Sequence, residues 1–449
     1  MFSAINRTIK RMVLRQQKAK PIVRISDTTL RDGLQTPGVR LGVPERVAIA
    51  RALADAGIHS IDIGFPATSP AEAAAARQIA RSVKGPILSV LARTKKEDVE
   101  LAAEVLSGVS PFKRAITLFV GTSPLHREHK HQMTRKQVLD TISSAIDAAH
   151  KHFEVISFGP EDASRTEPDF LIEVYREAIK AGAISIGFTD TVGILTPKKA
   201  ADTIKMIQDR VPNMDDAMLG VHFHNDLGMA TANSLACVEA GANMVQGTIN
   251  GIGERAGNTP IEEVVLALTL HKDQYRKDVS VDSTALLGLS KLVAELTGFH
   301  PATNKAVVGK NIFRTETGVH QDGLLQHPDT YMPFPPELIG AGPVEIVLGR
   351  NSGRAAVRHH LEAAGMEASE EHVRLVMDYL KTENHNPEDF AEIRTFVDRL
   401  RPYMATDDVV AKKLHELGIG EDGQPLGANG RHVDAPTGAD ALRSPSKQA

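Results

Sequence analysis

The feature of this chain that most constrains its fold is a repeated alternation of short apolar runs with longer segments of helical periodicity, through the first two-thirds of the sequence. The β-branched or apolar runs predict strands, and the intervening segments, several of which start beside proline, predict helices. Eight strands are predicted, at Ile22–Ser26, Ser60–Phe65, Pro86–Leu91, Ala115–Val120, Glu154–Gly159, Ala183–Asp190, Leu219–Asp226 and Met244–Gly251. The helices predicted between them include Pro44–Ala56, Pro70–Val83, Thr134–Lys151, Pro168–Ala181, Pro197–Val211 and Met229–Ala240.

Eight such units in about 250 residues match the size of a closed parallel barrel, whose connections are right-handed crossovers. A doubly wound open sheet is the alternative fold. We predict an α/β protein, with a (β/α)8 TIM barrel over residues 21–280 followed by a mainly helical linker subdomain over residues 281–365.

The pattern of the chain changes beyond residue 280. Helical periodicity over Thr284–Thr297 is followed by a loop-rich stretch, His300–Gly349. We expect a helical C-terminal region over residues 366–420 and a disordered tail over residues 421–449, which has no aromatic residue and is rich in Gly, Pro, Ala and Asp. The helices expected in this part are Ala355–Ala364, Glu370–Thr382, Pro387–Leu400 and Val409–Leu417.

Residues 1–20 are expected to form a basic arm, because the first 26 residues carry seven Lys or Arg and no acid. A transit peptide is the alternative, but Ser3 is the only serine before Ser26 and such peptides are usually rich in serine. Lys and Arg total 52 against 56 Asp and Glu, which argues against a nucleic-acid partner. No apolar stretch is long enough to span a membrane. A single cysteine, Cys237, excludes an internal disulfide and is expected to be buried, so we expect a cytoplasmic protein.

Polar side chains collect where the predicted strands end, and the carboxyl ends of barrel strands are where such barrels place their chemistry. A helix cap or a surface loop would explain any one of these residues, but not their recurrence at so many strand ends. The set comprises Asp27, Arg31, Asp32 and Gln35 after the first strand, Arg93 after the third, Gly121, Thr122 and Ser123 after the fourth, Glu161, Asp162 and Arg165 after the fifth, and Thr189, Asp190 and Thr191 at the sixth.

The sharpest element is His222-Phe223-His224 in the seventh strand. Residues two apart on a strand point to the same face, so both imidazoles could reach one divalent ion. Two hydrogen-bonded histidines without metal are the alternative. Asp32 could add a carboxylate, and two histidines with one carboxylate suit Zn²⁺, Mn²⁺, Fe²⁺ or Mg²⁺. The glycine-bearing segment 251–258 lacks the spacing of a nucleotide loop, and we expect its glycines to allow a close approach to the metal site or a ligand, with Asn258 as a further oxygen donor.

Three segments together resemble a known family: DTTLRDG at 27–33, HFHNDLGMATANSLACVEAGA at 222–242 and NGIGERAGN at 250–258. They are similar to the acyltransferases that condense acetyl-CoA with a 2-oxo acid, the α-isopropylmalate synthase and homocitrate synthase family. VGKNIFRTETGVHQDGLLQ at 308–326 is similar to that family's linker subdomain.

The resemblance implies a role for each matching residue. Asp32, His222 and His224 would bind a divalent metal (Mg, Mn or Zn), with Asn258 as a weaker contact. Arg31 would stabilise charge on the keto oxygen, and Glu161 would take part in substrate positioning and proton handling. The other substrate contacts expected are Thr191, Arg93, His126 and Arg127. His320 and Tyr331 would reach the active site of a partner subunit and assist deprotonation of acetyl-CoA, which implies a homodimer.

Three departures from the family pattern keep other activities open. Leu34 stands where the synthases usually carry Glu, and the local sequence DGLQ is more similar to that of hydroxymethylglutaryl-CoA lyase. Arg127 occupies the place of an arginine that holds a dicarboxylic 2-oxo acid in homocitrate synthases. The adjacent His126, in contrast, matches the sequence of the isopropylmalate synthases at this position. Alternatively, Arg127 is a solvent-exposed helix residue without a role in substrate binding. The residues after the linker show no alternating strand pattern typical of a leucine-sensing domain.

The expected function is therefore condensation of acetyl-CoA with 2-oxoisovalerate followed by thioester hydrolysis. The alternatives are a homocitrate-type enzyme acting on an acidic 2-oxo acid, a lyase that cleaves a carbon–carbon bond, and a catalytically silent barrel.

Overall fold

The computed structural model describes residues 20–366, 368–382 and 395. They form two compact units: the first runs to Ile312 and includes Glu337–Ala341, and the second comprises Phe313–Pro336 and the chain from Gly342 onward. The sequence placed the end of the barrel domain at residue 280, and this domain boundary stays a prediction. The first compact unit of the structure includes 32 further residues, up to Ile312.

The first unit is a closed parallel barrel, which confirms the predicted fold. Its eight strands follow one another in chain order around the barrel, and β1 pairs with both β2 and β8 to close it. The strands are β1 (Ile22–Asp27), β2 (Ser60–Asp62), β3 (Ile87–Arg93), β4 (Arg114–Gly121), β5 (Val155–Glu161), β6 (Ser185–Asp190), β7 (Met218–Phe223) and β8 (Met244–Gly247).

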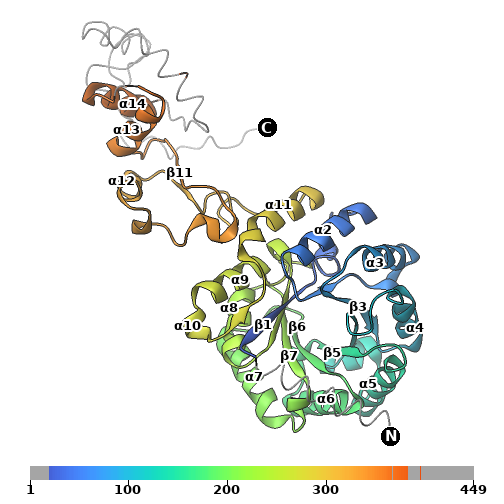
Figure 1. Cartoon of the computed structure of the whole chain (residues 1–449). Helices are drawn as coiled ribbons and strands as arrows, with labels where there is room; N and C mark the ends of the chain where they lie inside the picture. Colours follow the sequence, from blue (N-terminus) through green and yellow to red (C-terminus); the bar gives the residue numbers. More distant parts are fainter. Residues whose placement is uncertain (1–19, 367, 383–394, 396–449) are drawn as a thin grey trace, which may run out of the picture. The chain divides into compact units, whose positions relative to one another are not determined.

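Helices surround the strands (Figure 1), each helix following the strand before it in the chain. Local sequence sets their starts: Ser69 and Thr196 accept hydrogen bonds from the first turns of α3 and α7, and Thr134 with Gln137 forms a capping box on α5. The six predicted helices lie within two residues of the observed ends. The helices are α2 (Val43–Asp55), α3 (Pro70–Ser82), α4 (Lys96–Val105), α5 (Arg135–Ala149), α6 (Pro168–Ala181), α7 (Pro197–Arg210), α8 (Ala230–Glu239) and α9 (Ile261–Leu270).

Alternation along the strands separates the apolar core from the barrel interior. On β5, Ile156 and Phe158 are fully buried, whereas Ser157 and Gly159 line an internal cavity. The apolar core therefore lies between the strands and the helices, and the polar side chains of the interior lead toward the strand ends that carry the predicted site.

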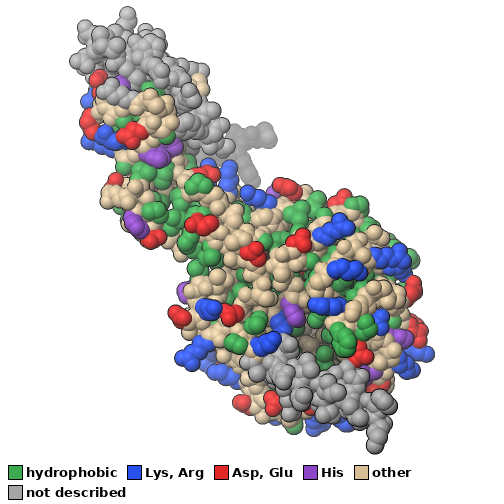
Figure 2. Space-filling model, viewed as in Figure 1, with side chains coloured by type: hydrophobic (Ala, Val, Ile, Leu, Met, Phe, Trp, Pro, Cys, Tyr) green, Lys and Arg blue, Asp and Glu red, His purple; other side chains and the backbone are tan. Residues whose placement is uncertain are grey.

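Further elements follow β8 within the first unit. The short helix α10 (Lys272–Tyr275) precedes β9 (Asp278–Val279), which pairs in parallel with the start of β1. Helix α11 (Leu286–Thr297) matches the helix predicted at 284–297 and contacts α2. In Figure 2, Lys and Arg side chains are interspersed with Asp and Glu on this unit, as the balanced composition predicts.

The second unit is mainly helical. It contains α12 (Gly318–Gln326), the short paired strands β10 (Arg314–Thr315) and β11 (Glu345–Ile346), α13 (Arg354–Ala363) and α14 (Glu370–Thr382). The interpretation of residues 300–349 as a loop-rich stretch did not include α12, because this helix contains two glycines and has only a weak apolar periodicity. The core residues of this unit are Leu348, Ala356, Val357, Leu361, Val373, Val376 and Leu380.

Several predictions fall on residues outside those described: most of the basic arm (1–19), the helix at 387–400 apart from residue 395, the helix at 409–417, and the tail at 421–449. Among the described residues, no helix is long and apolar enough to cross a membrane.

Candidate active site

Asp32, His222 and His224 come together at the carboxyl ends of β1 and β7. One donor atom from each lies within 4.8 Å of the others, and all three residues are buried. The Nε2 atoms of the two histidines are 3.3 Å apart, and His222 Nε2 lies 3.8 Å from Asp32 Oδ2. The pattern that predicted two imidazoles and a carboxylate on one rim therefore corresponds to a real cluster.

The electrostatics of this cluster keep its donors in the forms that bind a cation. Burial, with the neighbouring His224, lowers the pKa of His222 to about 3, so its ring is neutral near neutral pH. Burial also lowers the pKa of His224. Burial alone would raise the pKa of Asp32, but the charge of Arg31, followed by the two histidines, outweighs it and holds that pKa below its ordinary range. Two neutral imidazoles and one carboxylate fit a divalent metal ion.

Arg31 lies between two carboxylates. Its Nη1 donates to Asp32, and its Nε donates to Asp62 Oδ2 at 2.8 Å. Asp62, at the end of β2, is 2% exposed and also accepts a hydrogen bond from Thr28 Oγ1 at 3.1 Å. The site residues inferred from sequence did not include Asp62, although an acid inside the apolar run 60–65 was a visible signal.

The loop after β8 fixes the other side of Asp32. Asn258 Nδ2 donates to Asp32 Oδ1 at 2.9 Å and to the carbonyl of Ile252 at 3.1 Å, while the buried Asn258 Oδ1 has no hydrogen-bond partner. Gly253 has φ +151°, and a Cβ there would collide with Asn258 Nδ2 and lie 3.2 Å from Asp32 Oδ1. This glycine is therefore required for the close approach expected of the loop. The unpartnered oxygen of Asn258 fits an additional ligand, as a metal site there requires.

Arg255, in the same loop, is a second residue near the site that the sequence analysis did not single out. Its guanidinium donates to both carboxylate oxygens of Asp226 at 2.8 Å and to the carbonyl of Thr191 at 2.8 Å. Asp226 follows β7 and Thr191 follows β6, so Arg255 links three strand ends around the site. Thr191 Oγ1 accepts a hydrogen bond from Asp162 N at 2.9 Å. The hydroxyl proton of Thr191 can still be donated to a ligand.

Glu161, at the end of β5, faces a short π-helix that follows β4, His126–His131. Lys130 Nζ donates to both carboxylate oxygens of Glu161, at 2.8 and 2.7 Å, and His126 Nδ1 lies 3.5 Å from Glu161 Oε2. His126 Nε2 is 3.9 Å from Asp162 Oδ2. The structure thus places the two predicted residues His126 and Glu161 side by side.

Two predicted arginines have other partners in the structure. Arg93 forms a two-pronged ion pair with Asp98 at 2.8 Å, and this hydrogen-bonded partner raises the pKa of Arg93. Arg127 donates to Glu167 Oε1 at 2.6 Å and to the carbonyl of Thr122 at 3.0 Å. Its guanidinium also lies over the ring of Phe170, 5.0 Å from the centroid, and its side chain is only 12% exposed. Arg127 is therefore not the solvated helix residue considered as its alternative.

His320 and Tyr331 lie together in the second unit. Their rings stack with centroids 4.2 Å apart, and Tyr331 is 46% exposed. His320 is on α12, and a Cβ at Gly323 on the same helix would lie 2.6 Å from the Tyr331 ring. Close packing against a glycine therefore fixes the tyrosine beside the histidine.

Cys237 is fully buried on α8, as predicted, and burial raises its thiol pKa. A thiolate nucleophile is therefore disfavoured at this position.

The fold and site define a parallel (β/α)8 barrel that carries two histidines and a carboxylate at the carboxyl ends of its strands. The comparison with family models identifies the family of this barrel. Residues 22–293 match the HMGL-like family, and residues 307–388 match the model described as homocitrate synthase post-HMGL domain-like. The chain belongs to the HMGL-like family and, within it, to the 2-isopropylmalate synthases, as its relatives show.

Three relatives are each named 2-isopropylmalate synthase. The protein of Rhodopirellula baltica is 44% identical over 80% of this chain and 68% of its own length. That of Pelotomaculum thermopropionicum is 45% identical over 80% of this chain and 71% of its own length. That of Pyrococcus furiosus is 41% identical over 89% of this chain and 77% of its own length.

Solved structures agree on the fold. Hydroxymethylglutaryl-CoA lyase from Pseudomonas aeruginosa superimposes with a TM-score of 0.55 at 22% identity, covering 66% of this chain and 98% of that one. The lyase from Bacillus subtilis gives 0.55 at 20% identity, covering 64% and 97%. At these identities the likeness concerns the barrel and not the reaction.

Proposed function

We propose that this protein condenses acetyl-CoA with 2-oxoisovalerate and hydrolyses the resulting thioester, giving 2-isopropylmalate and CoA. The observation that carries this proposal is the buried cluster of Asp32, His222 and His224 beside Arg31, in a chain 41–45% identical to proteins named for that reaction. The intact cluster argues against a silent barrel.

Asp32, His222 and His224 would hold the divalent ion, with Asn258 as a further donor. When bound there, Mg²⁺, Mn²⁺ or Zn²⁺ would supply Lewis acidity that polarises the ketone of the 2-oxo acid. Arg31 carries a positive charge held in place by Asp32 and Asp62. It would stabilise the negative charge that develops on the keto oxygen as the carbon–carbon bond forms.

The residues after β4, β5 and β6 are proposed to hold the substrates. Thr191 has a hydroxyl proton available for the substrate carboxylate, because its oxygen already accepts from Asp162 N. Glu161 and His126 lie close enough to share a proton through a bound ligand or water. Their role would be to position acetyl-CoA and to move protons near its thioester.

The base for the acetyl methyl group is proposed to come from a second copy of the chain. The methyl group of a thioester is a weak carbon acid, so a base must be held against it. His320 and Tyr331 stack on each other and expose part of their rings, which leaves them able to reach a neighbouring subunit. On this proposal the functional unit is a homodimer.

Arg127 favours a neutral side chain on the 2-oxo acid. A dicarboxylic substrate needs a cation for its distal carboxylate, but Arg127 is already engaged by Glu167, the Thr122 carbonyl and the Phe170 ring. This arrangement supports 2-oxoisovalerate over 2-oxoglutarate as the substrate.

The test is CoA release, followed with a thiol reagent, from purified protein with acetyl-CoA, Mg²⁺ or Mn²⁺ and a panel of 2-oxo acids. Preference for 2-oxoisovalerate over 2-oxoglutarate, oxaloacetate and pyruvate supports the proposal, and preference for a dicarboxylate overturns it in favour of a homocitrate-type activity. Arg127→Gln sharpens the result: it should lower kcat/KM for 2-oxoisovalerate and 2-oxoglutarate by similar factors. A selective rise in KM for 2-oxoglutarate would place Arg127 in the substrate pocket.

A further inference from the structure

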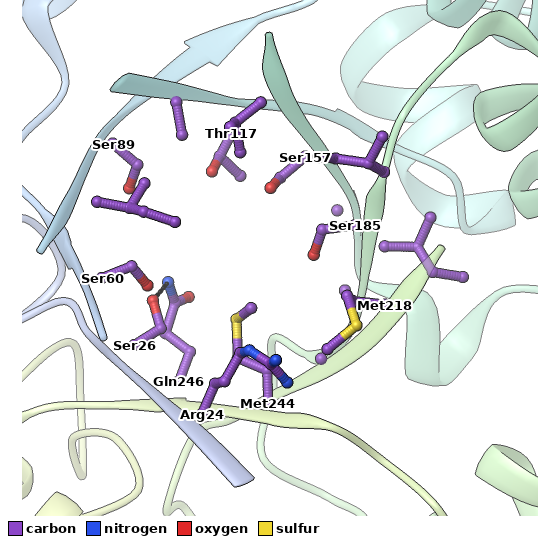
Figure 3. Close-up of a pocket in the computed structure, with 18 of the residues that line it drawn as sticks. Arg24, Ser26, Ser60, Ser89, Thr117, Ser157, Ser185, Met218, Met244 and Gln246 are labelled. Atoms are coloured by element: carbon purple, nitrogen blue, oxygen red, sulfur yellow. Dashed lines mark hydrogen bonds between the residues drawn. The ribbon is translucent and has the colours of Figure 1, made fainter. Parts of the chain in front are cut away.

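The interior of this barrel is hollow. Barrels of this kind usually fill their interior with layers of Val, Ile and Leu. Here a cavity of about 730 Å³ remains inside the strands, room for on the order of twenty waters. Figure 3 shows small polar side chains around the cavity, pointing into it. The ring comprises Ser26, Ser60, Ser89, Thr117, Ser157, Ser185 and Gln246.

The cavity reaches the candidate metal site at His222. His222 lines it, together with Thr189 and Gly159 near the ends of β6 and β5. Two residues beyond Gly159 lies Glu161, and two residues beyond Thr189 lies Thr191. A ligand held at His222 and Thr191 therefore has open space beneath it in the barrel.

Two glycines enlarge this space next to the site. Gly159 and Gly187 lie beside each other on the paired strands β5 and β6. A Cβ at Gly159 would contact only Thr189 Cγ2, at 3.9 Å, and a Cβ at Gly187 only Gly159 Cα, at 3.8 Å. Neither glycine has positive φ. Neither a close approach nor backbone geometry requires glycine here, although glycine weakens a strand.

We propose that this cavity is the subsite for the side chain of the 2-oxo acid, and that it admits unbranched, uncharged side chains longer than isopropyl. The inference rests on the proposed function, because the 2-oxo acid group must be held at the metal site for its side chain to enter the cavity. Acetyl-CoA is too large for the barrel interior and has to approach from the open mouth. The interior is therefore the space left for the side chain.

The lining explains why the side chain should be uncharged. Around the upper part of the cavity, Thr117, Ser157, Thr189 and Gln246 offer neutral hydrogen-bonding groups. The charged lining residues Arg24 and Glu154 lie at the opposite, amino-terminal end of the strands and are of opposite sign. A carboxylate in the upper part of the cavity, away from Arg24, would thus lose its hydration without gaining a neighbouring cation.

Calorimetry with the Mn²⁺-loaded full-length protein, without acetyl-CoA, tests the proposal through binding alone. We expect 2-oxohexanoate and 2-oxooctanoate to bind at least as tightly as 2-oxoisovalerate, since each buried methylene can strengthen binding by up to roughly fourfold. 2-Oxoadipate should bind at least tenfold more weakly than 2-oxohexanoate. A loss of more than tenfold in affinity from 2-oxoisovalerate to 2-oxohexanoate would overturn the inference.

Substitutions at the two glycines locate the subsite. Gly159→Val and the smaller change Gly187→Ala place methyl groups into open space. Relative to 2-oxoisovalerate, the affinity for 2-oxohexanoate should fall by at least tenfold in Gly159→Val and by at least threefold in Gly187→Ala. Gly288→Ala, on the exposed face of α11 with nothing near its Cβ, is the matched control. Equal losses for both ligands would overturn the assignment. If the wild type releases CoA with 2-oxoisovalerate but rejects the longer acids, only this inference fails; if no 2-oxo acid supports CoA release, the proposed function fails as well.

Discussion

Two groups of residues are proposed to act on the substrates, the buried cluster in the barrel and the stacked aromatic pair in the second unit. They differ in burial and in how many contacts they make within their own chain. Asp32, His222 and His224 are 3%, 8% and 6% exposed, and hydrogen bonds from Arg31 and Asn258 fix the carboxylate. The stacked pair His320 and Tyr331 lies on a smaller unit and is partly open to solvent. A buried polar cluster must satisfy its own partners, whereas an exposed aromatic pair is free to meet a second surface. Under the function proposed above, the barrel would hold its cation in a preformed site, whereas the base would act on the site of a neighbouring chain.

The largest expected effect is at the buried cluster. His222→Ala removes a donor that no nearby group replaces, so we expect metal affinity and turnover to fall by more than about 100-fold. Elemental analysis after dialysis and the CoA-release assay measure the two effects. His271→Ala, an exposed histidine outside the site, should change neither. Unchanged metal content in His222→Ala would refute its role as a ligand.

Loss of the cation beside the cluster should be next in size. Arg31→Ala is expected to lower kcat by roughly 10²–10³, as for the loss of one group that stabilises an oxyanion. Because Arg31 also pairs with Asp32, metal content is measured on the same sample and kcat is compared at saturating metal. A decrease of less than about tenfold would assign charge stabilisation to another residue.

The exposed pair should reveal whether one chain completes the site of another. His320→Ala and His222→Ala are each expected to be nearly inactive, but co-expression should restore about a quarter of wild-type activity, because half of randomly formed dimers are mixed and each carries one intact site. Separately purified variants that are combined only in the assay provide the baseline. No restoration in isolated mixed dimers would mean that the pair serves its own barrel.

The smallest effect concerns the stability of the barrel. Burial raises the pKa of Glu262 to about 7 from an ordinary 4.5, so the folded protein keeps a proton that the unfolded chain has already released. Stability should therefore fall as pH rises between those two values, by no more than about 3 kcal/mol from this group. Asp27, whose pKa burial also raises to about 7, contributes a similar slope.

Glu262→Gln should reduce this pH dependence by about half, measured by urea unfolding at several pH values across the window. The exposed Glu128→Gln should leave the slope unchanged. An unaltered slope in Glu262→Gln would mean that the buried carboxyl titrates alike in the folded and unfolded states.

The sequence predicted what depends on local pattern. Apolar alternation identified all eight strands, and the spacing of His222 and His224 predicted two imidazoles on one face. Contacts between residues distant in the chain could not be predicted in this way. Glu167, which engages Arg127, lies 40 residues away, and Asp62, which holds Arg31, lies 31 residues away on another strand. Helix α12 was not predicted from the sequence because its stability comes from packing against α13 and not from its own apolar periodicity.

The pairing of β1 has a consequence for the order in which the chain folds. β1 pairs with β8, which follows it about 220 residues later in the chain, with Ile25 beside Val245, and β9 extends the same edge at Asp278–Val279. During synthesis, the edge of β1 that pairs with β8 therefore stays unpaired until about 220 further residues have been added. The long sequence separation between these paired strands predicts slow closure of the barrel, and a strand edge that stays unpaired during this time is prone to aggregation.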